Sequence, residues 1–102
     1  MANIINTNGV AEPWVSDYFP ASTTSLTVPD LSNYRLIAVC EAPSETRFVD
    51  ATIAPISILS EGSTVEGIFS GSSDISIVVT KTSNTELKIA CHSWGGWIYL
   101  IP

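Results

Sequence analysis

The stretch "DISIVVTKTSNTELKIACHS", residues 74–93, contains two runs of alternating apolar and polar residues with a short polar segment between them. The alternate apolar positions are Ile75, Ile77 and Val79 in the first run, and Leu87, Ile89 and Cys91 in the second. Because successive side chains of a strand point to opposite faces, each run predicts a β-strand with one buried face. The connecting "TSNT", residues 82–85, is rich in turn-forming residues and predicts a tight hairpin.

Short segments of the same kind recur along the rest of the chain, bounded by Pro, Gly, Ser, Asn and Asp. They are 25–28, 35–41, 47–53, 56–59, 64–70 and 97–102. No window has the apolar spacing of an amphipathic helix. Regular short strands with turn signals between them predict an all-β fold. We therefore expect a compact antiparallel β-sandwich of about eight strands, with a jelly-roll or immunoglobulin-like outline, over residues 14–102.

Three polar segments are expected to be turns, and the N-terminus is expected to stand apart from the core. The turns are "SEGS" at 60–63, "SGSSD" at 70–74 and "VPDLSNY" at 28–34, the last of which should tuck Leu31 inward. Residues 1–13 are polar and turn-rich, which is typical of an arm. The domain organisation predicted is one arm followed by one sandwich domain.

The segment "RLIAVCE", residues 35–41, is apolar on both faces. Such a strand is expected in the centre of a sheet, or with one face at an interface. We take Leu36, Ala38 and Cys40 as the inward set and Ile37 and Val39 as the other face. Cys40 and Cys91 are then buried, reduced thiols, with a disulfide between neighbouring strands as the alternative.

The composition indicates self-association. Hydrophobic residues make up 45% of the 102 residues and charged residues only 14%, against about 25% charged residues in an average domain. A domain this small cannot bury all of that apolar surface alone, and copies of itself are the simplest partner. We expect a homotrimer whose seam is the second face of the Ile37/Val39 strand or the C-terminal strand.

The net charge of −6 argues against two classes of partner. Only four residues are basic, Arg35, Arg47, Lys81 and Lys88, and they form no cluster that would neutralise phosphates. Nucleic-acid binding is therefore not expected. No apolar run reaches the length of a membrane span, and the N-terminus lacks the pattern of a signal peptide, so membrane insertion is not expected either.

Catalytic and metal chemistry have little support in the sequence. His92 is the one histidine, and no nucleophile motif accompanies it. A metal site within one chain needs three or four ligands, and Cys91 and His92 should point to opposite faces. Three copies of His92 on a trimer axis remain an alternative. The carboxylates are scattered, so no enzymatic activity, metal or other cofactor is expected.

The closing stretch "CHSWGGWIYLIP", residues 91–102, gathers two of the three tryptophans around a Gly-Gly pair. We interpret it as a strand, a Trp-Gly-Gly-Trp turn and a final strand, with Gly95 and Gly96 supplying the positive φ of a two-residue hairpin loop. The candidate ligand-binding residues are Trp94, Trp97 and Tyr99. They form either a stacking platform for sugar rings or the packed aromatics of a sandwich end or oligomer seam.

The line "SLTVPDLSNYRLIAVC", residues 25–40, runs from a short strand through an aspartate-centred turn with a tyrosine into an apolar strand. It resembles small β domains at the ends of bacteriophage tail fibres and related virion appendages. The later "RFVDATIAPISIL" and the closing "WIYLIP" are similar to them as well. The resemblance implies a trimeric, Ser/Thr-rich domain without enzyme activity that attaches a virion to a host surface or caps a fibre.

The functional expectation is therefore a non-enzymatic structural or adhesion module of a phage or prophage virion. It would be a tail-fibre tip, a receptor-binding protein or an accessory structural protein, made in the host cytoplasm and located in the virion. Its further partners would be other virion proteins and a host-surface glycan. The alternative is a small lectin-like carbohydrate-binding module that uses surface Trp and Tyr, and a small hydrolase is the third reading.

Overall fold

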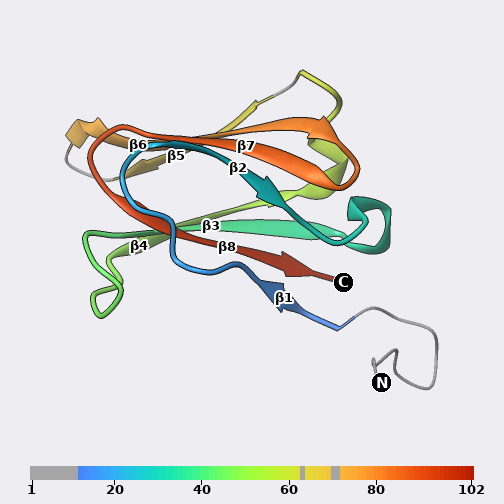
Figure 1. Ribbon diagram of the computed structural model, residues 1–102, viewed down its shortest axis with the longest axis horizontal. Coiled ribbons are helices and arrows are strands. Elements are labelled where there is room, and N and C mark those ends of the chain that lie inside the picture. The colour runs from blue at the N-terminus through green and yellow to red at the C-terminus, as the bar shows by residue number, and fades with distance from the viewer. Residues whose placement is uncertain (1–11, 63, 70–71) are drawn as a thin grey trace.

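The computed structural model describes residues 12–62, 64–69 and 72–102, and within them the protein is a β-sandwich. One sheet has the strand order β1-β8-β3-β4, and the other has the order β2-β7-β6-β5. The two sheets lie one above the other (Figure 1). The strands are β1 (Trp14–Val15), β2 (Thr23–Thr27), β3 (Leu36–Ala42), β4 (Asp50–Pro55), β5 (Thr64–Phe69), β6 (Ser72–Ser83), β7 (Glu86–Cys91) and β8 (Gly95–Ile101).

The strands pair antiparallel, and in each sheet a strand near the N-terminus pairs with a strand near the C-terminus. The first strand pairs with the last, β1 with β8, and the second with the last but one, β2 with β7. The hairpins β3–β4 and β5–β6 complete the two sheets, so the two nested pairs are the part of the topology that a jelly roll shares. The expected all-β antiparallel sandwich is thus confirmed.

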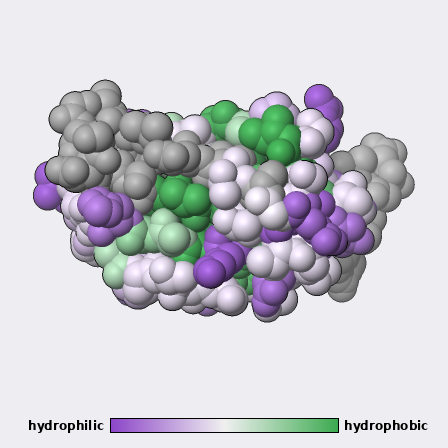
Figure 2. Space-filling model, turned by 90° about the horizontal axis from the view of Figure 1, so that it is seen from above, coloured by the Kyte–Doolittle hydropathy of each residue, from purple (hydrophilic) through white to green (hydrophobic). Residues whose placement is uncertain are grey.

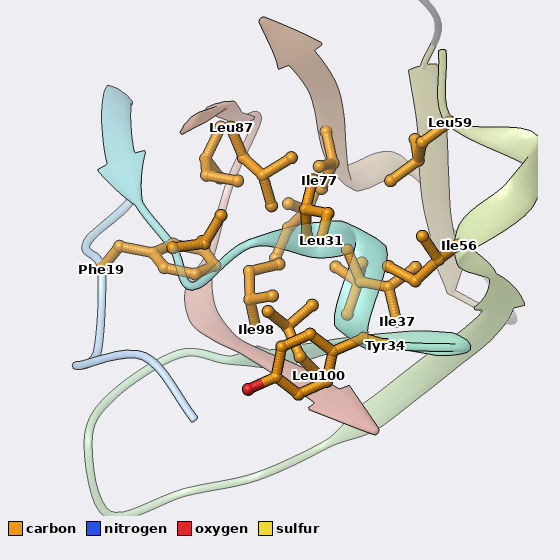
Figure 3. Close-up of a cluster of buried hydrophobic side chains, with 14 residues drawn as sticks. Phe19, Leu31, Tyr34, Ile37, Ile56, Leu59, Ile77, Leu87, Ile98 and Leu100 are labelled. Atoms are coloured by element: carbon orange, nitrogen blue, oxygen red, sulfur yellow. The ribbon is translucent and has the colours of Figure 1, made fainter. Parts of the chain in front are cut away.

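The core lies between the two sheets. Ile37, Ile98 and Leu100 from one sheet meet Ile77 and Leu87 from the other, and all five are fully buried. Figure 3 shows these side chains pointing toward one another, with Leu31 and Tyr34 entering from the β2–β3 connection. The predicted inward position of Leu31 is confirmed: it begins a 3-10 turn, Leu31–Asn33, in which the Asp30 carboxylate accepts a hydrogen bond from the Ser32 backbone N–H.

The hairpin predicted over residues 74–93 is confirmed, and so is the buried face of its strands. Strand β6 turns into β7 after Ser83, which pairs with Glu86. Val79 lies opposite Ile89, and both are fully buried in the core. The side chain of Ile75 lies outside the described part of β6. Cys91 follows Leu87 and Ile89 on the inner face, as expected, and is half-buried there.

The inward set predicted for β3 is wrong. Ile37 and Val39 point into the core, whereas Leu36, Ala38 and Cys40 point away from it, to the outer face of the sheet. The reason is that both faces of this strand are apolar, so the period of two identifies two faces without saying which is inner. Cys40 is nevertheless buried, with 6% of its surface exposed.

The Gly-Gly hairpin turn is also wrong. Gly95 and Gly96 begin strand β8 and pair with Ala42 and Glu41 of β3. Strand β7 belongs to the other sheet, so residues 92–94 cross between the sheets. Of the glycines in the described segments, Gly62 has a positive φ, and it lies in the expected 60–63 turn. The glycine pair serves close packing instead, because a Cβ on Gly96 would collide with the Cys40 carbonyl and one on Gly95 with that of Phe19.

Two other expected strands differ from the structure. The segment 56–59 is not a strand: Ile56–Ile58 forms a 3-10 turn after Pro55. The strand expected at 47–53 begins only at Asp50, and Val49, Ala51 and Ile53 are exposed. Of the turn expected at 70–74, residues 70 and 71 lie outside the described residues, and residues 72–74 begin strand β6 instead. The arm predicted at 1–13 lies outside the described residues except for Glu12 and Pro13, which are exposed immediately before β1.

Candidate functional site

Strand β8 places two of the three candidate aromatics on the outer face of its sheet. Ile98 and Leu100 point into the core, so Trp97 and Tyr99 point the other way. Trp97 lies opposite Cys40 of β3, and Tyr99 lies opposite Ala38. Trp97 and Tyr99 therefore share the outer face of this strand.

A hollow of about 400 Å³ opens on this outer face. Its lining residues are Cys40, Phe48, Trp97 and Tyr99. Phe48 comes from the connection between β3 and β4 and is 60% exposed. The sequence reading placed Phe48 in a strand and did not select it as a site residue. A bulky aromatic beside the polar "SETR" segment was the available signal.

Trp97 is held in place by a second aromatic ring. Tyr18 packs edge-on against it, with ring centroids 5.2 Å apart and an interplanar angle of 67°. The Tyr18 hydroxyl donates a hydrogen bond to the Ala42 carbonyl at 3.1 Å, which ties the β1–β2 connection to the end of β3. Trp94 lies in the crossing between the sheets, is half-buried and does not line the hollow.

The outer face around the hollow is apolar across all four strands. Tyr99 has Val15 of β1 on one side and Ala38 of β3 on the other, and Ile53 of β4 completes the row. Ile53 is 62% exposed and Tyr99 42%. The remaining outward strand positions are Leu36, Cys40, Ala42, Ala51, Pro55, Gly95, Trp97 and Ile101. No outward strand position of this sheet carries a charge.

The outer face of the other sheet has a different composition. Its outward positions include Thr23, Ser25 and Thr27 of β2, with Lys88 and Glu86 opposite the last two on β7. All five are exposed. In Figure 2, which views the molecule from the side of this sheet, hydrophilic residues stand among residues of intermediate hydropathy, with smaller hydrophobic patches. The two sheets therefore turn chemically unlike faces outward.

Glu41 is the most unusual ionisable residue. It follows Ile37 and Val39 on the inner face of β3, has 0% exposure, and neither carboxylate oxygen has a hydrogen-bond partner. Burial, together with the negative charge of Asp50, raises the pKa of Glu41 to about 8. Asp50 is its cross-strand neighbour on β4. The sequence interpretation counted Glu41 among the scattered carboxylates and did not predict that it is buried.

The thiols and the histidine form no common site. Cys40 and Cys91 are free, and they lie in different sheets, on an outer and an inner face, so the alternative of a disulfide between them is not realised. Burial raises the pKa of both thiols. His92 is exposed. Among the described residues, no three His, Cys, Asp or Glu side chains lie close enough to hold a metal ion.

Comparisons with protein-family models, with curated proteins and with solved structures find no match to this chain. No helix in the described segments is long and apolar enough to cross a bilayer. The class that fold and site together define is a small antiparallel β-sandwich that carries one apolar, aromatic-lined sheet face.

Proposed function

We propose that this protein is a non-enzymatic structural or adhesion module that acts as a homo-oligomer. The observation that supports the proposal is the uncharged outer face of the β1-β8-β3-β4 sheet, with Ile53, Phe48 and Tyr99 exposed on it. A solvated sheet face normally alternates apolar-in with polar-out. An apolar face of this extent on a soluble domain is typical of a protein interaction site.

The module belongs, in this proposal, to a phage or prophage virion, as a tail-fibre tip, a receptor-binding protein or an accessory structural protein. The basis for that assignment is the sequence resemblance over residues 25–40, 47–59 and 97–102. The expected partners are further copies of the chain, neighbouring virion proteins and a host-surface glycan. The expected location is the virion.

The test of the oligomer is the mass of the purified protein in solution. A trimer has three times the chain mass of 10.9 kDa, and light scattering after size exclusion is expected to find it at micromolar concentration. The physical reason is that the apolar outer face leaves water when copies associate, at about 25 cal/mol per Å² of apolar area. A stable monomer at that concentration would contradict the proposal.

A carbohydrate-binding module is the second candidate, and the hollow is the observation that favours it. Phe48, Trp97 and Tyr99 offer rings on which a sugar could stack. Small-ligand sites combine such apolar walls with a few placed polar groups. Here the side-chain polar groups of the lining are the Cys40 thiol, the Trp97 indole N–H and the Tyr99 hydroxyl. That is a sparse set for a ligand covered in hydroxyls, so the assembly role ranks first.

Trp97→Ala separates the two candidates, with Trp94→Ala as the control outside the hollow. Trp97→Ala is expected to lower the free energy of unfolding by about 1–3 kcal/mol, because it removes a half-buried ring and its contact with Tyr18. Thermal melting measures this loss. A glycan array probed with the wild type and both variants is expected to give the same pattern for all three proteins, because the hollow is not the glycan site in this proposal. If the wild type binds a glycan and Trp97→Ala abolishes that binding, the carbohydrate-binding module becomes the better-supported function.

A further inference from the structure

We propose that the seam between copies is the outer face of the β1-β8-β3-β4 sheet, with Ile53 of one copy entering the hollow of a neighbouring copy. The inference rests on the proposed homo-oligomer and adds the surface through which it forms. The hollow is the one lined by Cys40, Phe48, Trp97 and Tyr99. The occupant is a second copy of this chain.

The charge distribution restricts what can cover this face. The chain carries ten acidic and four basic residues, yet none stands at an outward strand position of this sheet. A charged partner would lose the hydration of its charges there without gaining an opposite charge. Two copies that meet through this face bury no strand charge from either side, whereas their other surfaces repel each other because each chain has a net charge of −6.

The relief of the face also fits a second copy. Ile53 protrudes from β4 with 62% of its surface exposed. Between Ile53 and the β8 aromatics, β3 offers only the small side chains of Ala38 and Cys40. The same surface therefore holds a protruding aliphatic side chain and a hollow of about 400 Å³, which is ample for it. A knob and a hole at different places on one face allow each copy to be both donor and acceptor, as a closed ring of copies requires.

The size of the face is that of a small interface. Strands β3 and β8 have seven residues, β4 has six and β1 has two, which at about 3.3 Å per residue and about 4.8 Å between strands cover roughly 350 Å² in projection for each copy. Side-chain relief and the Phe48 connection add to this area. Two such faces give about 700 Å² in projection before this relief is counted, which is the size of a weak interface, below the roughly 1,200 Å² of buried surface at which stable specific interfaces begin.

The first experiment places a charge on the knob. Ile53→Lys is expected to weaken self-association at least tenfold, measured as the shift from oligomer to monomer by light scattering over a concentration series. Thr27→Lys is the matched control, because Thr27 is also exposed on an edge strand but lies on the outer face of the other sheet, opposite Glu86. It is expected to keep the wild-type mass. Circular dichroism and melting confirm that each variant is folded.

The outcomes distinguish this inference from the proposed function. If Ile53→Lys keeps the wild-type mass at every concentration, the seam lies elsewhere and the inference is wrong, while the homo-oligomer stands. If the wild type is a monomer, both are wrong. If Thr27→Lys dissociates as readily as Ile53→Lys, the effect is not specific to this face and the inference is again wrong.

The second experiment uses Cys40 inside the hollow as a reporter. When Ile53→Cys is treated with diamide, the new thiol of one copy and Cys40 of the next should form a disulfide. Each thiol loses one proton and one electron, and diamide accepts both pairs and is reduced. Residues 53 and 40 of one copy are diagonal on adjacent strands, at a spacing too wide for a disulfide. A closed ring then gives covalent trimer on a non-reducing gel. Ile53→Cys combined with Cys40→Ser should give none. If the single variant runs only as a monomer on the non-reducing gel, Ile53 does not enter the hollow of a neighbouring copy and the inference is wrong.

Discussion

Gly96→Ala is expected to cost more than about 3 kcal/mol of the free energy of unfolding, or to prevent folding altogether. A Cβ at this position would collide with the backbone carbonyl of Cys40. Gly96 is locked on its other side too, because its N–H donates to the Phe19 carbonyl and its carbonyl accepts from the Phe19 N–H, both at 2.9 Å. Overpacking usually costs about 1–3 kcal/mol because side chains can shift, but here the obstacle is the backbone of the paired strand.

The measurement is urea unfolding followed by tryptophan fluorescence, and Gly62→Ala is the matched control. Gly62 has a φ of +82°, and a Cβ there would meet nothing within 4 Å. Its substitution is therefore expected to cost about 1–2 kcal/mol, from backbone conformation alone. Against a total stability of about 5–15 kcal/mol for a domain, the two losses are readily told apart. Equal losses in the two variants would contradict the close-approach explanation.

The same reasoning changes the expectation for Gly95→Val. In the hairpin that the sequence predicts, valine would be harmful because such a loop needs a positive φ at Gly95. The variant is still expected to be harmful, but because a side chain at Gly95 would collide with the Phe19 carbonyl. From sequence alone, a Gly-Gly pair between aromatics fits a turn and a close approach equally well. The contact that decides between them joins Gly95 to a residue far away in the chain.

The strands were predictable where one face was apolar and the other polar. Residues 86–91 alternate in this way, and both their strand and their facing follow from the pattern. The β3 strand does not alternate, so its facing was open. Glu41 made the choice harder, since a carboxylate in register with Ile37 and Val39 argues for the outer face. The β-branched side chains of Ile37 and Val39 pack into the core, and because Glu41 shares their strand face it is buried as well.

Half of the candidate site was predictable for the same reason. Trp97 and Tyr99 are two residues apart on one strand, and their common face follows from that spacing alone. Phe48 and Tyr18 reach the site through connections from elsewhere in the chain, and no local pattern shows that they lie beside Trp97. Trp94 was grouped with Trp97 by nearness in sequence, but a crossing between the sheets separates it from the hollow.

Glu41 determines the expected pH dependence of stability. In the unfolded chain its carboxyl group titrates near the ordinary value of 4.5, whereas in the folded protein its pKa is about 8, because of burial first and of Asp50 second. Between those values the folded state holds a proton that the unfolded state has released. The free energy of unfolding is therefore greatest below pH 4.5 as far as this group is concerned, and it falls as the pH rises toward 8.

The size of the fall follows from the same linkage. One bound proton gives a slope of at most about 1.4 kcal/mol per pH unit, and we expect a total loss on the order of 2–3 kcal/mol between pH 5 and pH 8. The other ionisable groups that act at this site are Asp50 on β4 and Cys91 on β7. Burial raises the pKa of Cys91 from its ordinary 9.0, which places its titration above this window.

Glu41→Gln removes the titrating group while keeping its shape, and it is expected to flatten the pH profile between 5 and 8. At pH 8 the variant should be more stable than the wild type by about 1–3 kcal/mol, because no buried charge has to form there. Below pH 5, where the wild-type carboxyl is neutral as well, the two proteins should differ little. Asp50→Asn is the control for the second cause, and it should reduce the slope without abolishing it. Urea midpoints measured at half-unit pH intervals provide the test, and a slope that survives in Glu41→Gln would assign the pH dependence to another residue.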